Sequence, residues 1–146
     1  MVKNENGFTL IEMLMVLGCL TLMLTIVNTI TANMFEIYEQ KAFLNQLQKD
    51  IYYVQTYAIE NKKYVTLRFR TDQNEYAAYS YTNNDLISTQ KAESIKFKKA
   101  GNVLVTYTPA GNIQGPTTIN LTDKKGKTIY KLIFQLGRGR FYITEV

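Results

Sequence analysis

One carboxylate stands beside an apolar segment that contains no other charge. Glu12 is followed by 23 residues, 13–35, that include no Asp, Glu, Lys or Arg. An acidic side chain costs roughly 2.5–3.5 kcal/mol at the centre of a membrane helix and usually faces a partner. No Lys or Arg occurs between Lys3 and Lys41, so the uncut chain has no cation close to Glu12.

Cleavage of the chain would create the missing cation. A cut between Gly7 and Phe8 would leave a new α-amine on Phe8, at the head of the helix that carries Glu12. Glu12 is four residues away from that amine, and the Glu12 of a neighbouring copy could approach it as well. Such a cut would therefore supply a cation with which Glu12 could pair.

Other kinds of site chemistry find little support in the composition. Histidine is absent and Cys19 is the single cysteine, which excludes an internal disulfide, a Cys/His metal site and a Cys–His nucleophile. The aspartates are scattered without pairing, and neither a Gly-x-Ser-x-Gly elbow nor a phosphate-binding loop occurs. The sequence predicts a protein that is not an enzyme and that has no metal or cofactor.

The net charge of +5 allows nucleic acid, another polyanion or an anionic membrane surface as a partner. Basic residues gather near the C-terminus, where Tyr130 and Tyr142 could stack on bases if they are exposed. The alternative is a solvated turn beside half-buried tyrosines. The candidate DNA-binding residues are Lys124, Lys125, Lys127, Lys131, Arg138 and Arg140.

The charge-free run is long enough to span a bilayer as a helix. Its 23 residues extend about 34 Å, against about 30 Å for the hydrocarbon core. A cleaved secretory signal fits less well, because Lys3 is offset by Glu5 and no small-x-small site follows Val27. A buried core helix would be too uniformly apolar for so small a domain. The favoured interpretation is a single membrane segment with a cytoplasmic N-terminus.

The second part of the helical region is amphipathic. No Pro or Gly occurs between Cys19 and Ala100, so one helix can extend from about Phe8 to Asn61. Its apolar positions recur at spacings of three and four residues, which is one stripe of a helix. The members of this stripe are Leu44, Leu47, Ile51, Val54 and Ala58.

The remaining chain alternates between apolar and polar residues and is punctuated by turns, as expected of antiparallel strands. The predicted strands are 64–70, 75–82, 94–99, 103–108, 117–122, 128–136 and 141–146. The apolar face of such a sheet needs a cover, and the helix stripe can provide it. The fold class expected is α+β, with a long N-terminal helix packed on an antiparallel β-sheet.

Six consecutive residues, Gly7-Phe8-Thr9-Leu10-Ile11-Glu12, stand directly before the apolar run. This motif resembles the class III signal of type IV pilins and type II secretion pseudopilins. The resemblance implies that a prepilin peptidase cuts between Gly7 and Phe8 and methylates Phe8. It also implies that Glu12 acts in filament assembly, where it neutralises the N-terminal amine of an adjacent subunit.

The C-terminal part is similar to minor pseudopilins of the GspH/FimT type, and most of all to ComGD-like competence minor pilins of Gram-positive bacteria. The matching features are Gly111-Asn112-Ile113-x-Gly115, the basic hairpin and Gly137-Arg138-Gly139-Arg140. The function implied is that of a minor pilin in a competence type IV pilus that takes up DNA. Alternatives are a pseudopilin of a type II-like secretion system, or a pilus subunit that binds DNA through its basic C-terminal patch.

The resemblance also implies a domain organisation, partners and a location. The expected segments are a cleaved leader (1–7), a transmembrane and filament-core helix (8–34), an amphipathic helix half (35–62) and a β-rich globular domain (63–146). The implied partners are other major and minor pilins, the prepilin peptidase, the pilus assembly platform, the membrane before assembly, and DNA as a further candidate. The protein is expected in the cell membrane first and at the cell surface after assembly.

Overall fold

A computed structural model describes residues 9–80, 85–99 and 101–146, with the side chains of 27–33 excepted. Contacts divide the chain into a first unit that ends at Tyr38 and a second unit, Glu39–Val146. Among the described residues, every buried side chain belongs to the second unit. A fragment that begins at Glu39 therefore retains the whole of this core.

One helix, α1 (Leu10–Glu60), contributes to both units. It ends where the sequence predicts a stop. Lys62 adopts a left-handed conformation with φ 52°, and the N–H of Lys63 donates to the carbonyl of Ala58 at 3.1 Å. These two features form a Schellman-type C-cap, which satisfies carbonyls that the last turn leaves without helical partners.

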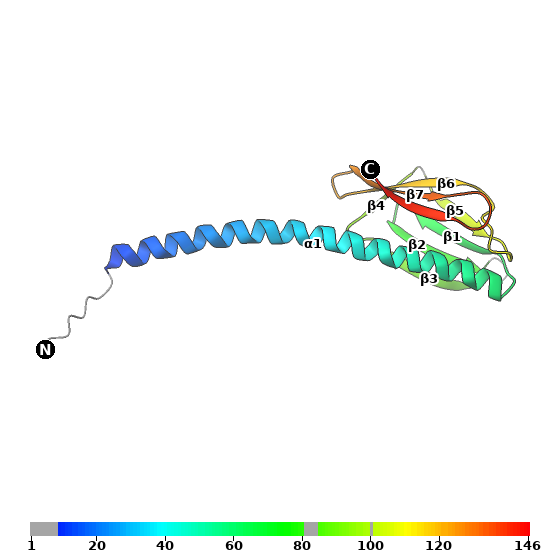
Figure 1. The fold of residues 1–146 in the computed structure, drawn as a ribbon, viewed down its shortest axis with the longest axis horizontal. Helices are drawn as coiled ribbons and strands as arrows, with labels where there is room; N and C mark the ends of the chain where they lie inside the picture. The colour runs from blue at the N-terminus through cyan, green and yellow to red at the C-terminus, as the bar shows by residue number, and fades with distance from the viewer. Residues whose placement is uncertain (1–8, 81–84, 100) are drawn as a thin grey trace. The chain divides into compact units, whose positions relative to one another are not determined.

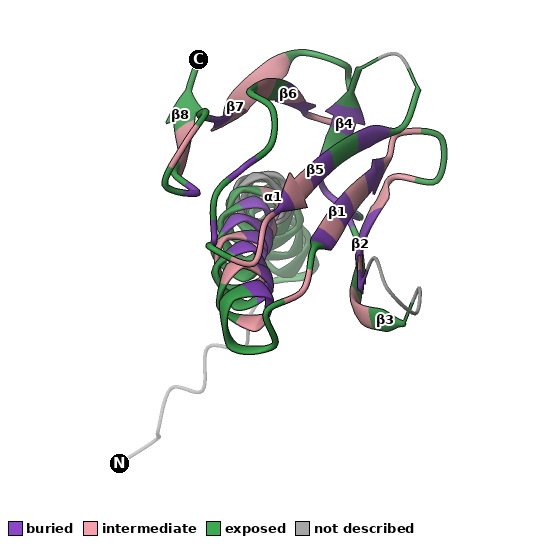
Figure 2. Cartoon of the chain, turned by 90° about the vertical axis from the view of Figure 1, so that its right-hand side faces the viewer, coloured by how far each residue is buried: buried purple, intermediate pink, exposed green. Residues whose placement is uncertain are grey.

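The predicted apolar stripe of α1 is confirmed as the side that packs against the strands. Leu47, Ile51, Val54 and Ala58 are fully buried, and Leu44 is nearly so. Figure 2 shows the buried side of α1 turned toward the strands of the second unit. A run of positions spaced three and four apart can bury only one side of a helix, so this part of α1 needs a sheet to cover it.

The strands form two four-stranded antiparallel sheets, whereas the sequence analysis predicted one sheet (Figure 1). Their orders are β3-β2-β1-β5 and β4-β6-β7-β8. One strand, β3, was not predicted. The strands are β1 (Val65–Arg70), β2 (Glu75–Ser80), β3 (Leu86–Lys91), β4 (Lys96–Lys98), β5 (Val103–Tyr107), β6 (Thr117–Thr122), β7 (Thr128–Phe134) and β8 (Phe141–Glu145).

Aromatic rings join the two sheets at the centre of the core. Phe69 on β1 lies 5.3 Å from the ring of Phe97 on β4 and 6.2 Å from that of Phe134 on β7. Phe43 of α1 contacts the Tyr76 ring of β2 at 6.1 Å. Burying such rings supplies a large part of the apolar area that holds a small domain together.

Asn74 ties the β1–β2 turn of the first sheet to the segment that leads into β4 of the second. It lies in the left-handed region with φ 54°. Its amide nitrogen donates to the carbonyls of Ala92 at 2.5 Å and Ile95 at 2.6 Å, and its amide oxygen accepts from the N–H of Phe97 at 3.0 Å. Asparagine suits this position because it tolerates positive φ and carries both donors and an acceptor.

A polar contact connects α1 to the first sheet. The hydroxyl of Tyr76 donates to Asp50 Oδ2 at 2.6 Å, and Gln46 Nε2 donates to Asp50 Oδ1 at 2.8 Å. Burial raises the pKa of Tyr76, and the hydrogen bond and charge of Asp50 raise it further. The neutral phenol is therefore the form that the folded protein holds.

Replacement of Tyr76 by phenylalanine should change how stability depends on pH. A hydrogen bond to a charged group contributes about 1.5–3 kcal/mol, and we expect a loss of about that size at pH 7. Because the folded pKa lies above the unfolded value of about 10, the contribution is present below pH ~10 and is lost above it. Urea unfolding of the Glu39–Val146 fragment should thus show a shallower decline above pH ~10 in Tyr76→Phe than in the wild type.

Tyr107→Phe is the matched control. Burial also raises the pKa of Tyr107, but its hydroxyl has no hydrogen-bond partner among the described residues. This substitution should leave the free energy of unfolding at pH 7 unchanged or slightly higher. An equal loss at pH 7 in the two variants would contradict the role given to the Tyr76–Asp50 bond.

Candidate functional site

Glu12 lies in the first turn of α1, directly after a helix cap. Thr9 accepts the N–H of Glu12 through its Oγ1 at 3.4 Å, and its carbonyl accepts the N–H of Met13 at 3.2 Å. This places Glu12 at the third helical position, where its charge also favours the helix dipole. Sequence reasoning missed this cap, although Thr-x-x-Glu before an apolar run is its usual signature. Gly7 and Phe8 lie outside the described residues.

The apolar side chains between Leu10 and Ile26 have no cover from the described residues of the first unit. The described ones are between 52% and 82% exposed, and Cys19 is exposed among them. So large an uncovered apolar surface requires a partner. The exposed members up to residue 26 are Leu10, Ile11, Met13, Leu14, Met15, Val16, Leu17, Leu20, Leu22, Met23, Leu24 and Ile26.

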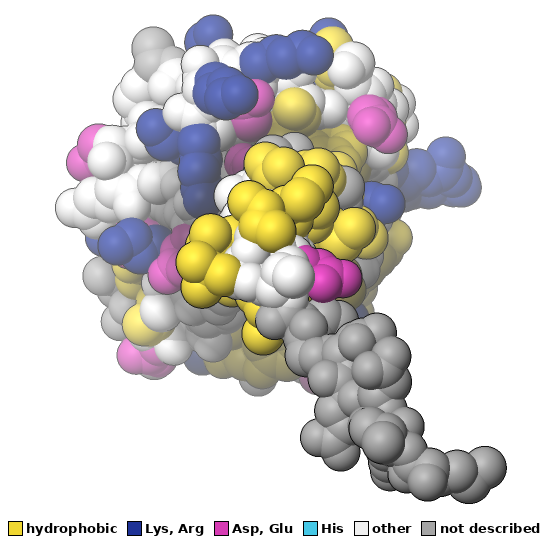
Figure 3. All heavy atoms as spheres, turned by 90° about the vertical axis from the view of Figure 1, so that its left-hand side faces the viewer, with side chains coloured by type: hydrophobic (Ala, Val, Ile, Leu, Met, Phe, Trp, Pro, Cys, Tyr) yellow, Lys and Arg dark blue, Asp and Glu magenta, His cyan; other side chains and the backbone are white. Residues whose placement is uncertain are grey.

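The threonines of this stretch are compatible with an apolar environment. Thr21 donates its hydroxyl to the carbonyl of Gly18 at 2.8 Å, and Thr25 donates to that of Leu22 at 2.7 Å. A hydroxyl that bonds to its own helix needs no water. Figure 3 shows apolar side chains gathered on the helix end that faces the viewer. Among the residues that the structure describes, no helix is long and apolar enough to cross a membrane.

The candidate DNA-binding residues fall into three groups along β7. Lys124, Lys125 and Lys127 are exposed in the turn before the strand, Lys131 is half-buried within it, and Arg138 and Arg140 are exposed in the turn after it. The seven residues of β7 separate the two turns by about 20 Å. On the face visible in Figure 3, basic side chains likewise form several groups with acidic ones between them.

The two tyrosines near these residues differ in position. Tyr130 alternates with Lys131 and pairs with Leu121, so it lies on the inner side of its sheet beside α1. Tyr142 pairs with Ile133 on the opposite side and is 39% exposed. Tyr142 is therefore the tyrosine of this pair that a ligand on the outer side could reach.

The turn between β7 and β8 is held against α1 by close packing. Gly137, Arg138 and Gly139 all have positive φ, of 79°, 46° and 62°. Gln55 Nε2 donates to the carbonyl of Gly111 at 3.0 Å, and Gly139 sits against both groups. Sequence reasoning gave Gln55 no role, because a polar residue beside the stripe is indistinguishable there from a solvated one.

A methyl group at Gly139 should destabilise this turn far more than one at Gly137. A Cβ on Gly139 would overlap Gln55 Nε2 and the carbonyl oxygen of Gly111, whereas a Cβ on Gly137 meets nothing within 4 Å. Both positions carry the strain of positive φ, which costs an L-residue about 1–2 kcal/mol. We expect Gly137→Ala to lose about that amount and Gly139→Ala at least ~2 kcal/mol more, measured by urea unfolding of the Glu39–Val146 fragment. Equal losses would contradict the close contact.

The described residues contain no group of three or more Cys, Asp or Glu side chains that could hold a metal ion. What the structure offers instead is a helix start with one acid, an uncovered apolar stretch, and a globular unit with exposed basic turns.

Comparison with known proteins addresses each end of the chain. Residues 2–28 match the prokaryotic N-terminal methylation motif. Two crystal structures of the type IV minor pilin FimU from Pseudomonas aeruginosa strain PAO1 have a similar fold. One is 11% identical with a TM-score of 0.56, and the match covers 71% of this chain and 87% of FimU. The other is 13% identical with a TM-score of 0.57, over 71% and 91% of the two chains.

At this level of identity, the likeness to FimU establishes the fold alone. The comparison with curated proteins finds no significant match. The chain thus combines the prokaryotic N-terminal methylation motif with a pilin-like fold.

Proposed function

We propose that this chain is a minor pilin of a competence type IV pilus, processed between Gly7 and Phe8 and required for uptake of extracellular DNA. The observation that carries the assembly part is the start of α1. There, the methylation motif leads into an exposed apolar stretch whose single charge is Glu12. The motif implies membrane anchoring followed by assembly into a pilus.

The apolar stretch gives a physical reason for these two stages. Lipid covers it before assembly, with the N-terminus on the cytoplasmic side, and neighbouring helices cover it in the filament. In the filament, Glu12 pairs with the α-amine that cleavage creates on Phe8 of an adjacent subunit. A buried charge is tolerated only when its partner is present, so this pair also fixes the register between subunits. Other pilins, the prepilin peptidase and the assembly platform are the partners.

Deletion of the gene distinguishes a competence pilin from a pseudopilin of a secretion system. A competence pilin is required for DNA uptake, so transformation should fall to background while protein export stays normal. A pseudopilin of a type II-like secretion system would give the reverse result. Complementation with the wild-type gene, and failure of complementation by Gly7→Val through blocked processing, complete the test.

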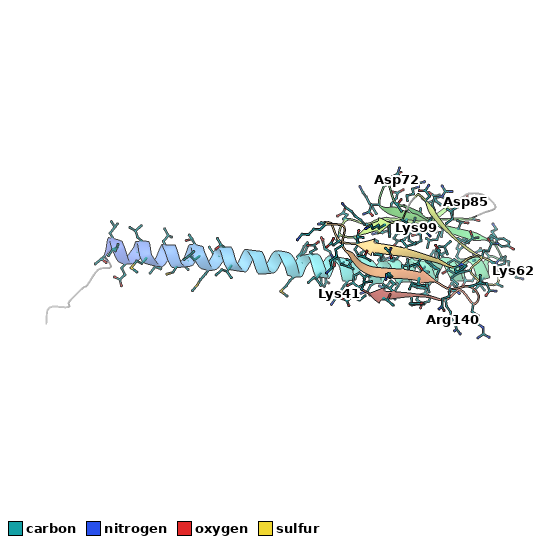
Figure 4. The ribbon with its side chains drawn as sticks, turned by 90° about the horizontal axis from the view of Figure 1, so that it is seen from above. Lys41, Lys62, Asp72, Asp85, Lys99 and Arg140 are labelled. Atoms are coloured by element: carbon teal, nitrogen blue, oxygen red, sulfur yellow. The ribbon has the colours of Figure 1, made fainter. Side chains whose placement is uncertain are left out.

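Direct DNA binding is a second candidate function. Its support is the turn that carries Arg138 and Arg140, which the packing of Gly139 against Gln55 holds in place. Figure 4 shows Arg140 at the periphery of the second unit, toward the end opposite Lys41. Exposed guanidinium groups on a fixed turn suit phosphate contacts without sequence preference.

The binding test uses the fragment from Glu39 onward and labelled DNA at low salt. If the patch binds DNA, charge reversal at Lys124, Lys125 and Arg140 should remove the mobility shift, and the shift should weaken steeply with salt. The separation of the two turns allows a finer comparison. Reversal of Arg138 and Arg140 alone tests one end of β7, and reversal of Lys124 and Lys125 alone tests the other. Unchanged binding in all variants would refute the patch.

A further inference from the structure

β8 is the last strand of its sheet, and two hydrogen bonds fix how its backbone is oriented. The N–H of Val146 donates to the carbonyl of Ile129 at 3.0 Å, and the N–H of Gln135 donates to the carbonyl of Arg140 at 2.9 Å. The register between β7 and β8 is regular throughout, without a bulge. In an antiparallel ladder, hydrogen-bonded and non-hydrogen-bonded pairs alternate along the strand.

This alternation assigns each residue of β8 to one of its two sides. Even-numbered residues bond to β7, so odd-numbered residues direct their N–H and C=O groups to the open side. These are Phe141, Ile143 and Glu145. No backbone partner is recorded for these groups among the described residues. The open side of β8 thus presents donors and acceptors at every second residue, which is the pattern that an added strand satisfies.

The other three sheet edges are protected in ways that β8 is not. β4 has only three residues, and Lys96 and Lys98 are exposed on it. β5 is partly covered, because Thr106 accepts from the N–H of Gln114 beside the Tyr107–Ile113 bridge. β3 pairs through a shifted register and carries mostly polar side chains. Short length, lysine, covering loops and irregular pairing are recognised means of preventing strand addition.

A groove lies alongside the open edge, between β8 and α1. It has a volume of about 310 Å³ and is lined by Lys41, Leu44, Asn45, Gln48, Tyr130, Ile143 and Glu145. Further along β8, the ring of Tyr52 lies 5.0 Å from that of Phe141 and remains 57% exposed. A strand placed beside β8 would turn every second side chain toward this face of α1. Apolar residues at those positions would cover Ile143 and the exposed part of Tyr52.

A second copy of β8 fits this edge poorly. Antiparallel pairing about Ile143 would match the free backbone groups, but a two-fold axis there would reverse the direction of the second α1. Subunits of one filament need their N-terminal helices to run the same way, and this step rests on the proposed function. We therefore propose that the open edge of β8 receives an extended segment of a different protein, apolar at every second position, as a fifth strand on β4-β6-β7-β8.

The test uses a short peptide as the added strand. Because the peptide has no helix, it can pair with β8 in either direction. The probe is a synthetic peptide with the sequence of residues 139–146, GRFYITEV, and a scrambled peptide of equal composition is the control. Amide hydrogen exchange of the full chain in detergent micelles is followed by NMR. Saturating peptide should slow exchange at Phe141, Ile143 and Glu145 by about tenfold or more and leave the β3, β4 and β5 edges unchanged.

Proline variants distinguish loss of strand binding at the open side of β8 from loss of folding. Ile143→Pro removes a donor on the open side but no ladder bond, so the protein should stay folded and lose peptide binding. Ile143→Val shortens the same side chain, keeps the N–H and should bind. Glu145→Pro provides the same test where the side chain is exposed. Thr144→Pro removes a bond to β7 and should lower stability.

Three results would overturn the proposal. The first is unchanged exchange at the three amides with saturating peptide. The second is equal binding by Ile143→Pro and Ile143→Val. The third is protection of the same amides without peptide through dimerisation of the chain, which would assign the edge to a second copy. None of these results depends on whether filaments form, so failure of the proposal and failure of the proposed function can be told apart.

Discussion

Replacement of Glu12 by valine is expected to remove the subunit from filaments while its processing and membrane association stay intact. The carboxylate is proposed to neutralise the α-amine on Phe8 of an adjacent subunit, in an environment with little water. Removal of one member of a buried ion pair costs about 3–5 kcal/mol, because the other charge is left without a partner. Incorporation should fall on the order of a hundredfold or more, measured by immunoblot of sheared filaments against the membrane fraction.

Glu12→Gln separates this role from helix capping. Glutamine keeps the backbone N–H that Thr9 Oγ1 accepts but has no charge. If Glu12 served the helix start alone, Glu12→Gln would assemble almost normally. We expect it instead to fail nearly as completely as Glu12→Val, with Glu12→Asp retaining partial assembly. Normal assembly of the glutamine variant would refute the ion pair.

Replacement of Phe69 by alanine is expected to cause the largest loss of stability in the globular unit. Phe69 is fully buried, and its ring contacts Tyr76, Phe97 and Phe134 from both sheets. Truncation of a buried phenylalanine to alanine usually costs about 3–5 kcal/mol, since it removes apolar contact and leaves a cavity. Urea unfolding of the Glu39–Val146 fragment should show a loss in this range.

Leu104→Ala is the control on the neighbouring strand. Leu104 pairs with Arg68 across β1 and β5 but is 56% exposed. Its truncation should change the free energy of unfolding by no more than about 0.5 kcal/mol. Losses of similar size in the two variants would contradict the placement of Phe69 at the junction of the sheets.

The helix and its buried side could be predicted because packing leaves a direct periodic pattern in the sequence. Leu44, Leu47, Ile51, Val54 and Ala58 repeat at helical spacing, and all of them are buried. The end of α1 was also predicted at Asn61-Lys62-Lys63, because cations are favourable near the negative end of a helix. The left-handed conformation of Lys62 was not predicted. Most strands were found for the related reason that alternation reports a half-buried sheet.

The division into two sheets was not predictable, because it depends on pairings between residues distant in the chain. β3 was missed because its side chains are mostly polar and exposed, which leaves no alternation to detect. The tie that Asn74 makes to Ala92 and Ile95 was equally hidden, since an asparagine in a polar turn resembles any other.

One candidate site could be recognised from the sequence, whereas the spatial arrangement of the other could not. The Gly7–Glu12 motif stands out because a charge beside an apolar run is unusual in any chain. The basic residues were grouped because they are close in sequence, yet a strand of seven residues separates the two turns in space. The basic residues are therefore more widely spread on the surface than their closeness in sequence indicated.

The most direct test of the proposed pilin function is the mass of the mature N-terminus. The full chain would be expressed with and without a prepilin peptidase, extracted in detergent and analysed by intact mass and N-terminal fragmentation. With the peptidase, we expect a chain that lacks residues 1–7 and carries one methyl group on the amine of Phe8; without it, the uncut chain. An uncut chain in both cultures, or cleavage at another position such as beyond Val27, would contradict the assignment.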